Sequence, residues 1–236
     1  TTGLDYMDTE LVGISLSYKA GEAYYIPLNH DDDSVDQLAL DIVLKELRPL
    51  LESSSNKIIG QNIKFDKNVL AKYGVDIASI KNDTMMMSYV LDASATRHNL
   101  DALSSYYLNY KTSTFEDVAG KGVKQITFDK VPIEAATNYA AEDADITLRL
   151  YEELNPRLEG EDSLNKLNEE IEIPLIEVLS EMEQNGAILN SKILNSQSKD
   201  LESRIKKLEE KAYQLAGEEF NLCLLYTSDA ADEKRC

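Results

Sequence analysis

The stretch Asn138–Leu148 reads NYAAEDADITL and lies inside a longer segment, Ile133–Leu154, that follows Pro132. Apolar residues recur along this segment at helical spacing, which predicts a long amphipathic helix. Tyr139 and Asp143 are four residues apart, so they share one face of that helix. An acidic residue on a helix is most often solvated, but Asp143 is set among alanines, one turn after a hydrogen-bonding side chain.

A second stretch, Gly60–Leu70, repeats this arrangement. It reads GQNIKFDKNVL, in which a short apolar strand, Lys57–Gly60, is followed by a helix. Asn62 and Asp66 are again four residues apart on one helical face. The recurrence of this arrangement in both stretches argues against two unrelated solvated acids.

The flanking segments indicate an α/β fold. Glu10–Tyr18 alternates apolar and polar residues, and Glu22–Leu28 follows a turn at Gly21, so the two predict a β-hairpin. The cluster Asp31–Ser34 offers N-cap residues for a helix over Val35–Leu51. Further helices are predicted over Phe65–Tyr73, Thr84–Leu91 and Leu100–Tyr107.

Pro156 and the turn Gly160–Ser163 predict a domain boundary near residue 155. Two long helices are expected beyond it, over Leu164–Gln184 and Ile193–Ala216. Leucines recur every seven residues in the second helix, at Leu194, Leu201, Leu208 and Leu215. Because this repeat is short, a helical hairpin packed on its own chain is favoured, and a dimeric coiled coil remains the alternative.

Composition excludes several classes of protein. The 236 residues carry 24 basic and 43 acidic side chains, for a net charge of −19, which rules out binding nucleic acid by bulk phosphate neutralisation. No apolar run is long enough for a membrane span, and the start, Thr1–Asp5, has no signal-peptide pattern. We therefore expect a cytoplasmic protein and, since no initiator Met is present, a fragment.

Cysteine and histidine usage limits the metals that the chain could bind. Both cysteines, Cys223 and Cys236, lie near the C-terminus, and the histidines are His30 and His98. A disulfide or zinc site is therefore not expected in the body of the chain. Any metal would be a hard cation held by carboxylates, namely magnesium or manganese.

Taken together, GQNxKxD and the later YAxEDAxxT resemble the second and third exonuclease motifs of the bacterial DNA polymerase I family (family A). The resemblance extends from Thr1 to about Leu222 and includes SYVLDASATRHNLDALSSYYL and TFEDVAGKGVKQITF. It implies that residues 1–155 form a ribonuclease H-like proofreading domain, which removes nucleotides from a DNA 3′ end. It also implies that residues 156–222, with IEIPLIEVLSEMEQNGAILN, begin the polymerase thumb.

The resemblance assigns roles residue by residue. Asp66 and Asp143 match the aspartates that hold two divalent cations, and Tyr139 matches the tyrosine that orients the attacking water. The residues that resemble those holding the unpaired terminal nucleotides are Gln61, Asn62, Arg97 and Phe115. The implied partners are a single-stranded DNA 3′ end and primer-template DNA, bound by a monomer. Structural alternatives remain for some of these residues: a core tyrosine for Tyr139, a loop anchor for Phe115 and a surface cation for Arg97.

The two ends of the chain depart from the family pattern. The family's first motif is an Asp-Thr-Glu strand followed by a turn like Thr1–Asp5, so that strand is expected upstream of Thr1, and the fragment is expected to be inactive alone. Asp8–Glu10 also reads Asp-Thr-Glu, but it precedes the next strand, and we interpret it as a coincidence. Residues 223–236 begin CLLYTSDAADE, which is similar to a translated sequencing adapter; a divergent natural tail is the alternative.

Two other functions fit parts of the sequence. A stand-alone ribonuclease D-like exonuclease would share the motifs but continue into a different helical domain after Ile171. A non-catalytic acidic scaffold would associate through the C-terminal leucine repeat, and metal binding at the carboxylates would argue against it.

Overall fold

The computed structural model describes residues 1–32 and 35–222 as a mixed α/β chain, which confirms the predicted fold class. The chain divides into two compact units, Thr1–Asn185 and a second unit that begins at Gly186. Two features of the sequence lie outside the described residues: part of the acidic cluster, Asp33 and Ser34, and the adapter-like segment 223–236 with both cysteines.

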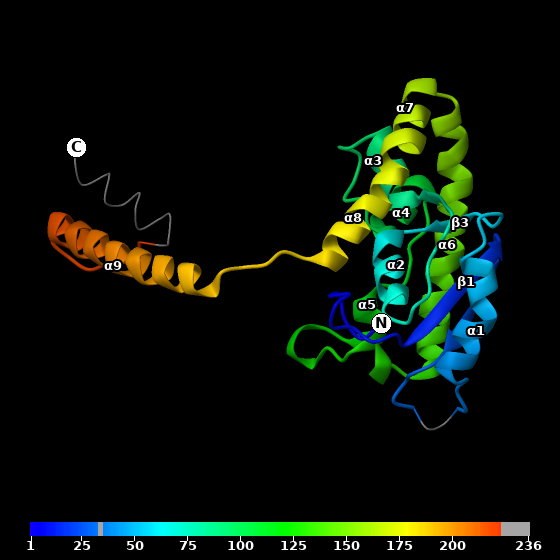
Figure 1. Ribbon diagram of the computed structural model, residues 1–236, viewed down its shortest axis with the longest axis horizontal. Helices are drawn as coiled ribbons and strands as arrows, with labels where there is room; N and C mark the ends of the chain where they lie inside the picture. Colours follow the sequence, from blue (N-terminus) through cyan, green and yellow to red (C-terminus); the bar gives the residue numbers. More distant parts are fainter. Residues whose placement is uncertain (33–34, 223–236) are drawn as a thin grey trace. The chain divides into compact units, whose positions relative to one another are not determined.

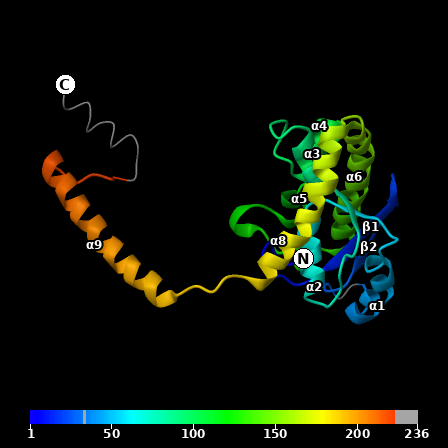
Figure 2. The same ribbon diagram turned by 45° about the horizontal axis from the view of Figure 1, so that its top comes forward.

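The predicted hairpin is confirmed. Strands β1 (Gly13–Lys19) and β2 (Glu22–Pro27) pair antiparallel around a turn in which Gly21 has φ 83°. Helix α6 (Ile133–Glu159) packs along the hairpin, as Figures 1 and 2 both show. The backbone N–H of Gly21 donates to Asp145 of α6, which ties the turn to the helix.

A second strand pair lies apart from the hairpin. Strands β3 (Ile58–Gly60) and β4 (Ile80–Asp83) are parallel and are connected through α2 (Ile63–Ala71). Within the described residues the two pairs form separate sheets. Strand β4 was not predicted from the sequence, because four residues, IKND, are too few to establish an alternating pattern.

Helix α1 (Leu40–Leu51) begins five residues later than predicted, and its N-cap Ala39 makes no side-chain cap. The acidic cluster caps a different helix: Asp32 accepts a hydrogen bond from the N–H of Ile133, the first residue of α6, at 3.1 Å. Before α1, the Gln37 side chain forms two hydrogen bonds with the backbone of His30.

Helix α6 also extends past its predicted end at Leu154, through Pro156, to Glu159. Proline removes one helical hydrogen bond. Packing offsets this loss, since Leu154 and Leu158 are almost fully buried in one cluster with Met87. Pro156 therefore lies inside a packed helix rather than in a linker.

The remaining helices of the first unit are short. Helices α3 (Thr84–Leu91) and α4 (Leu100–Tyr107) have the predicted bounds. Helix α5 (Phe115–Ala119) and the 3-10 turns η1 (Gly122–Lys124) and η2 (Phe128–Lys130) lie in a stretch for which no element was predicted.

The single helix expected over Leu164–Gln184 is divided. It consists of α7 (Asp162–Leu167), a π-helical segment η3 (Asn168–Glu172) and α8 (Ile173–Asn185). Pro174 supplies no N–H at the start of α8, which accounts for the irregular turn before it.

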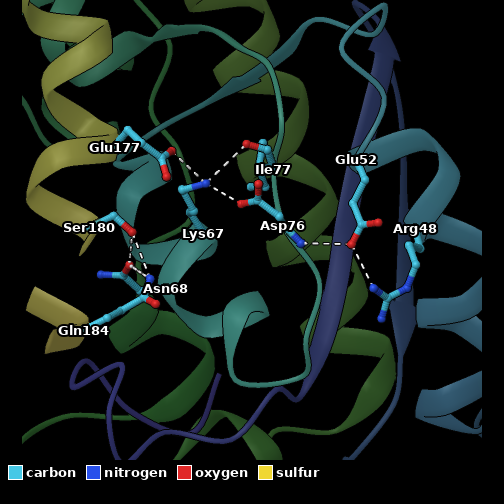
Figure 3. A network of polar contacts seen from close by, with 9 residues as sticks. All are labelled: Arg48, Glu52, Lys67, Asn68, Asp76, Ile77, Glu177, Ser180 and Gln184. Atoms are coloured by element: carbon cyan, nitrogen blue, oxygen red, sulfur yellow. Dashed lines mark hydrogen bonds and ion pairs between the residues drawn. The ribbon is translucent and has the colours of Figure 1, made fainter.

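Polar contacts join α8 to α2, as Figure 3 shows. Lys67, whose side chain is 4% exposed, forms ion pairs with Asp76 and with Glu177 of α8. Asn68 accepts a hydrogen bond from Ser180 at 2.6 Å. Residues up to Asn185 thus belong to the first compact unit.

In the second unit, α9 (Ser191–Ala216) is capped by the Asn190 side chain and ends at Gly217, which has φ 78°. The seven-residue repeat is exposed on this helix, at 49% for Leu194, 51% for Leu201, 65% for Leu208 and 70% for Leu215. No helix among residues 1–32 and 35–222 is long and apolar enough to cross a bilayer.

The cap that Asp32 provides predicts a measurable loss of stability. Asp32→Ala should lower the free energy of unfolding by about 0.5–2 kcal/mol, the usual loss for an N-cap, because Ile133 loses its acceptor. Urea unfolding of the chain measures this value, with the exposed neighbour Asp31 replaced by alanine as the control. Equal stabilities for the two variants would contradict the cap.

Candidate nuclease site

Asp66 lies one turn into α2, directly after β3. The turn between them requires Gly60, because a Cβ there would lie 2.7 Å from the Ile63 side chain. Solvent reaches Asp66, but protein surrounds it densely, and the loss of hydration, followed by repulsion from Asp83, raises its pKa to about 7. The Thr1 amino group opposes this shift. Asp66 is therefore a carboxylate with little charge compensation.

Tyr139 and Asp143 lie one turn apart on one face of α6, and their side chains are close enough for each to shift the pKa of the other. Loss of hydration, followed by repulsion from Asp101, raises the pKa of Asp143 to about 7. Burial and the nearby charge of Asp143 hold the pKa of Tyr139 well above its usual value. The pair thus joins a neutral hydroxyl to a carboxylate in unfavourable surroundings for its charge.

The structure brings Tyr139 and Asp143 together, but it does not join Asp66 to them in one cluster. Among the described residues, the charges that shift the pKa of Asp66 are Asp83 and the Thr1 amine, and those that shift the pKa of Asp143 are on other residues. No group of three or more potential metal ligands gathers in the described part of the chain. A shared metal site of Asp66 and Asp143 therefore remains a prediction.

The two residues before α2 differ in their freedom to contact a ligand. Gln61 uses both ends of its amide within the protein: Nε2 donates to the carbonyl of His98 at 2.9 Å, and Oε1 accepts from the Thr84 hydroxyl. Asn62 is exposed in a left-handed conformation, with φ 59°. A direct contact with DNA is thus more readily available to Asn62 than to Gln61.

Arg97 and Phe115 lie in different surroundings. Arg97 is exposed on the loop between α3 and α4. Phe115, the first residue of α5, is half-buried, and its ring centroid lies 6.4 Å from those of Phe128 and Tyr139. Phe115 therefore anchors its loop and also borders Tyr139, so its predicted role at the site remains open to test.

Asp8–Glu10 has structural contacts of its own. Thr9 is buried, and its hydroxyl accepts a hydrogen bond from the N–H of Gly3 at 2.7 Å. Glu10 accepts one from the Tyr73 hydroxyl at 3.0 Å. These contacts close the N-terminal loop, which supports the interpretation of this Asp-Thr-Glu as a coincidence.

The acids beside Asp143 also have structural partners. Glu142 accepts hydrogen bonds from the Tyr110 hydroxyl at 2.7 Å and from the N–H of Ser113 at 2.8 Å. Asp145 binds Gly21, as described above. Of the three acids in the AEDAD sequence, Asp143 is the one whose carboxylate pairs with Tyr139.

Asp83 was not predicted as a site residue, but the structure places its carboxylate near Asp66. Its carboxylate is the N-cap of α3 and is 2% exposed. An aspartate directly before Thr84, at the start of a predicted helix, is a typical N-cap pattern and could have identified it.

Comparison with known proteins agrees with this architecture. A family model described as a 3'-5' exonuclease, of the DNA polymerase A group, matches residues 1–159. The DNA polymerase I of Pseudomonas aeruginosa is 48% identical over 225 residues, which cover 94% of this chain and 25% of that protein. The DNA polymerase I of Rhizobium leguminosarum is 40% identical and is covered over 23% of its length. The chain thus spans about a quarter of the length of these relatives.

The fold is also found in a solved structure. The POL domain of Pol1 from M. smegmatis, in complex with DNA primer-template and dNTP, matches with a TM-score of 0.66 and 21% identity, over 89% of this chain and 32% of that one. Because the family model covers more than half of the described residues, the family is established on sequence as well as on fold. The chain belongs to the 3'-5' exonuclease domain family of the DNA polymerase A group.

Proposed function

We propose that the chain is the proofreading portion of a bacterial, cytoplasmic DNA-directed DNA polymerase that removes nucleotides from a DNA 3′ end by phosphodiester hydrolysis. The observation that carries this proposal is the juxtaposition of Tyr139 and Asp143 on one face of α6, within the residues that match the exonuclease family. The relatives named above are DNA polymerases, which favours this function over a ribonuclease D-like exonuclease or an acidic scaffold.

The donor atoms suit magnesium or manganese. Asp66 and Asp143 offer hard carboxylate oxygens, and the unfavourable environment of each charge would be relieved by a cation. Two cations, when bound, would activate a water molecule for attack and would stabilise the leaving 3′ oxygen. We propose that Asp66 and Asp143 hold these cations.

Tyr139 acts as a neutral hydrogen-bonding group in this proposal. Because its pKa lies well above the usual value, its hydroxyl stays protonated at physiological pH and cannot serve as a general base. It can orient a water molecule beside Asp143. Tyr139 would therefore position the attacking water, and the proton of that water would pass to bulk solvent.

The DNA end would be held by local contacts, since a net charge of −19 opposes broad phosphate binding. Asn62 and Arg97 are exposed and can reach a strand, and Phe115 offers a ring edge beside Tyr139. Gln61, which is bonded to Thr84 and His98, would hold the backbone that presents Asn62 to the strand.

We further propose that residues 156–222 begin the polymerase domain. The intact protein would act as a monomer on single-stranded ends and primer-template DNA.

Removal of the Asp143 carboxylate should abolish proofreading. In the intact polymerase, Asp143→Ala is expected to reduce 3′ hydrolysis of labelled single-stranded DNA by about 100-fold or more, with polymerase activity retained. Asp145→Ala is the matched control, because this acid lies two residues away and binds the hairpin turn. Near-normal hydrolysis by Asp143→Ala would remove this residue from the proposed site.

Loss of the Phe115 ring should weaken binding of the unpaired strand. Phe115→Ala is expected to cost about 1–3 kcal/mol of single-strand affinity, the usual loss for a stacking aromatic, with little effect on polymerisation. Tyr106→Ala removes an exposed aromatic on α4 and serves as the control. Unchanged exonuclease kinetics for Phe115→Ala would show that the ring is a loop anchor.

The raised pKa of Asp143 predicts how stability depends on pH. The folded value of about 7 exceeds the ordinary 3.8, so the contribution of Asp143 to stability is full below pH 3.8 and is lost as pH rises through 7. Asp143→Asn should therefore be more stable than the wild type at pH 8, by about 1–3 kcal/mol, and equally stable at pH 4. Denaturant unfolding without metal measures both values.

Magnesium provides the control for this comparison. It should stabilise the wild type at pH 8 more than Asp143→Asn, because the variant lacks a charged ligand. Parallel pH profiles for the two proteins without metal would contradict the raised pKa.

A further inference from the structure

The carboxylate of Asp83 accepts backbone hydrogen bonds from the first turns of two helices. Its oxygens lie 3.1 Å from the N of Asn62 and 2.8 Å from the N of Ile63, at the start of α2. They also lie 2.9 Å from the N of Met85 and 3.4 Å from the N of Met86, at the start of α3. One buried side chain therefore binds the N-termini of both helices.

Helix α2 relies on this carboxylate for its cap. Its own N-cap residue, Asn62, has φ 59° and makes no side-chain cap. The first N–H groups of a helix need an acceptor from outside the helix. Asp83, which follows 21 residues later in the sequence, is the acceptor for Asn62.

The placement of Asp83 is unfavourable for a simple structural cap. It is 2% exposed and close enough to Asp66 for the two carboxylates to repel each other. A serine could cap α3 without placing a buried charge beside Asp66. A carboxylate has enough acceptor capacity to bind donors from two helices at once.

We propose that Asp83 is a positioning residue, which fixes the first turn of α2 against β4 and α3 and thereby sets where α2 presents Asp66. The inference rests on the proposed exonuclease function. Ile63, whose N–H is bound by Asp83, is 2% exposed and lies one turn before Asp66. A shift of this turn would move the carboxylate of Asp66, and displacements of about 1 Å can cost 100-fold in rate.

Asp83→Ser in the intact polymerase separates the two caps. The shorter serine side chain is expected to cap α3 but not to reach α2. We expect kcat for single-stranded DNA hydrolysis to fall by about 10- to 100-fold and the Mn²⁺ binding midpoint to rise by about tenfold, as for other residues that support metal ligands. KM for the strand and polymerase activity should change little.

Asn190→Ala is the matched control, because it removes the N-cap of α9, whose acceptor lies 3.2 Å from the N of Ile193. It should leave exonuclease kcat and the Mn²⁺ midpoint unchanged. If Asp83→Ser does not fold, Asp83→Asn keeps the shape of the side chain and replaces one acceptor oxygen with a donor. The same losses of kcat and Mn²⁺ affinity in Asp83→Asn support the proposal.

A folded Asp83→Ser or Asp83→Asn variant with wild-type kcat and Mn²⁺ midpoint would overturn the proposal and leave Asp83 as a structural cap. If the wild-type polymerase itself fails to cut single-stranded DNA, the proposed function is contradicted. The Mn²⁺ midpoint, measured by electron paramagnetic resonance without substrate, then decides the role of Asp83 independently of activity.

Discussion

Helix α6 packs closely along the hairpin β1–β2 because small side chains face the strands. Ala136 and Ala140 are 0% and 8% exposed, and they pack in one cluster with Val12, which is fully buried. This contact sets the orientation of the two turns of the helix that carry Tyr139 and Asp143. The candidate site therefore depends on the same close packing that holds the first compact unit together, and a bulky residue in this interface would disturb both.

The two carboxylates of the proposed site lie in surroundings that oppose their charge. Loss of hydration and neighbouring acids raise the pKa of Asp66 and of Asp143, in a chain whose net charge is already −19. Groups with strongly shifted pKa values gather at functional sites. A carboxylate that the protein stabilises poorly would gain more from a divalent cation, which supports the metal-binding role that we propose for this pair.

The sequence predicted the bounds of helices that are set by neighbouring residues. It did not predict bounds that are set by contacts with residues far along the chain. The bounds of α4 were predicted correctly because Asn99 caps it locally. The start of α1 was wrong because Asp32 caps α6, which lies far along the chain. At the site, the four-residue spacing of Tyr139 and Asp143 predicted their contact. The role of Asp83 could not be predicted, because its hydrogen bonds to α2 depend on how β3 and β4 pair.

We propose above that Asp66 and Asp143 hold divalent cations at a DNA 3′ end. The most direct measurement is anomalous diffraction from crystals of the intact polymerase with Mn²⁺ and a short single strand. We expect manganese peaks within bonding distance of Asp66 and Asp143, next to the terminal phosphate. The Tyr139 hydroxyl should face the same phosphate. Manganese bound instead at Asp8 and Glu10, with Asp66 and Asp143 free of metal, would contradict it.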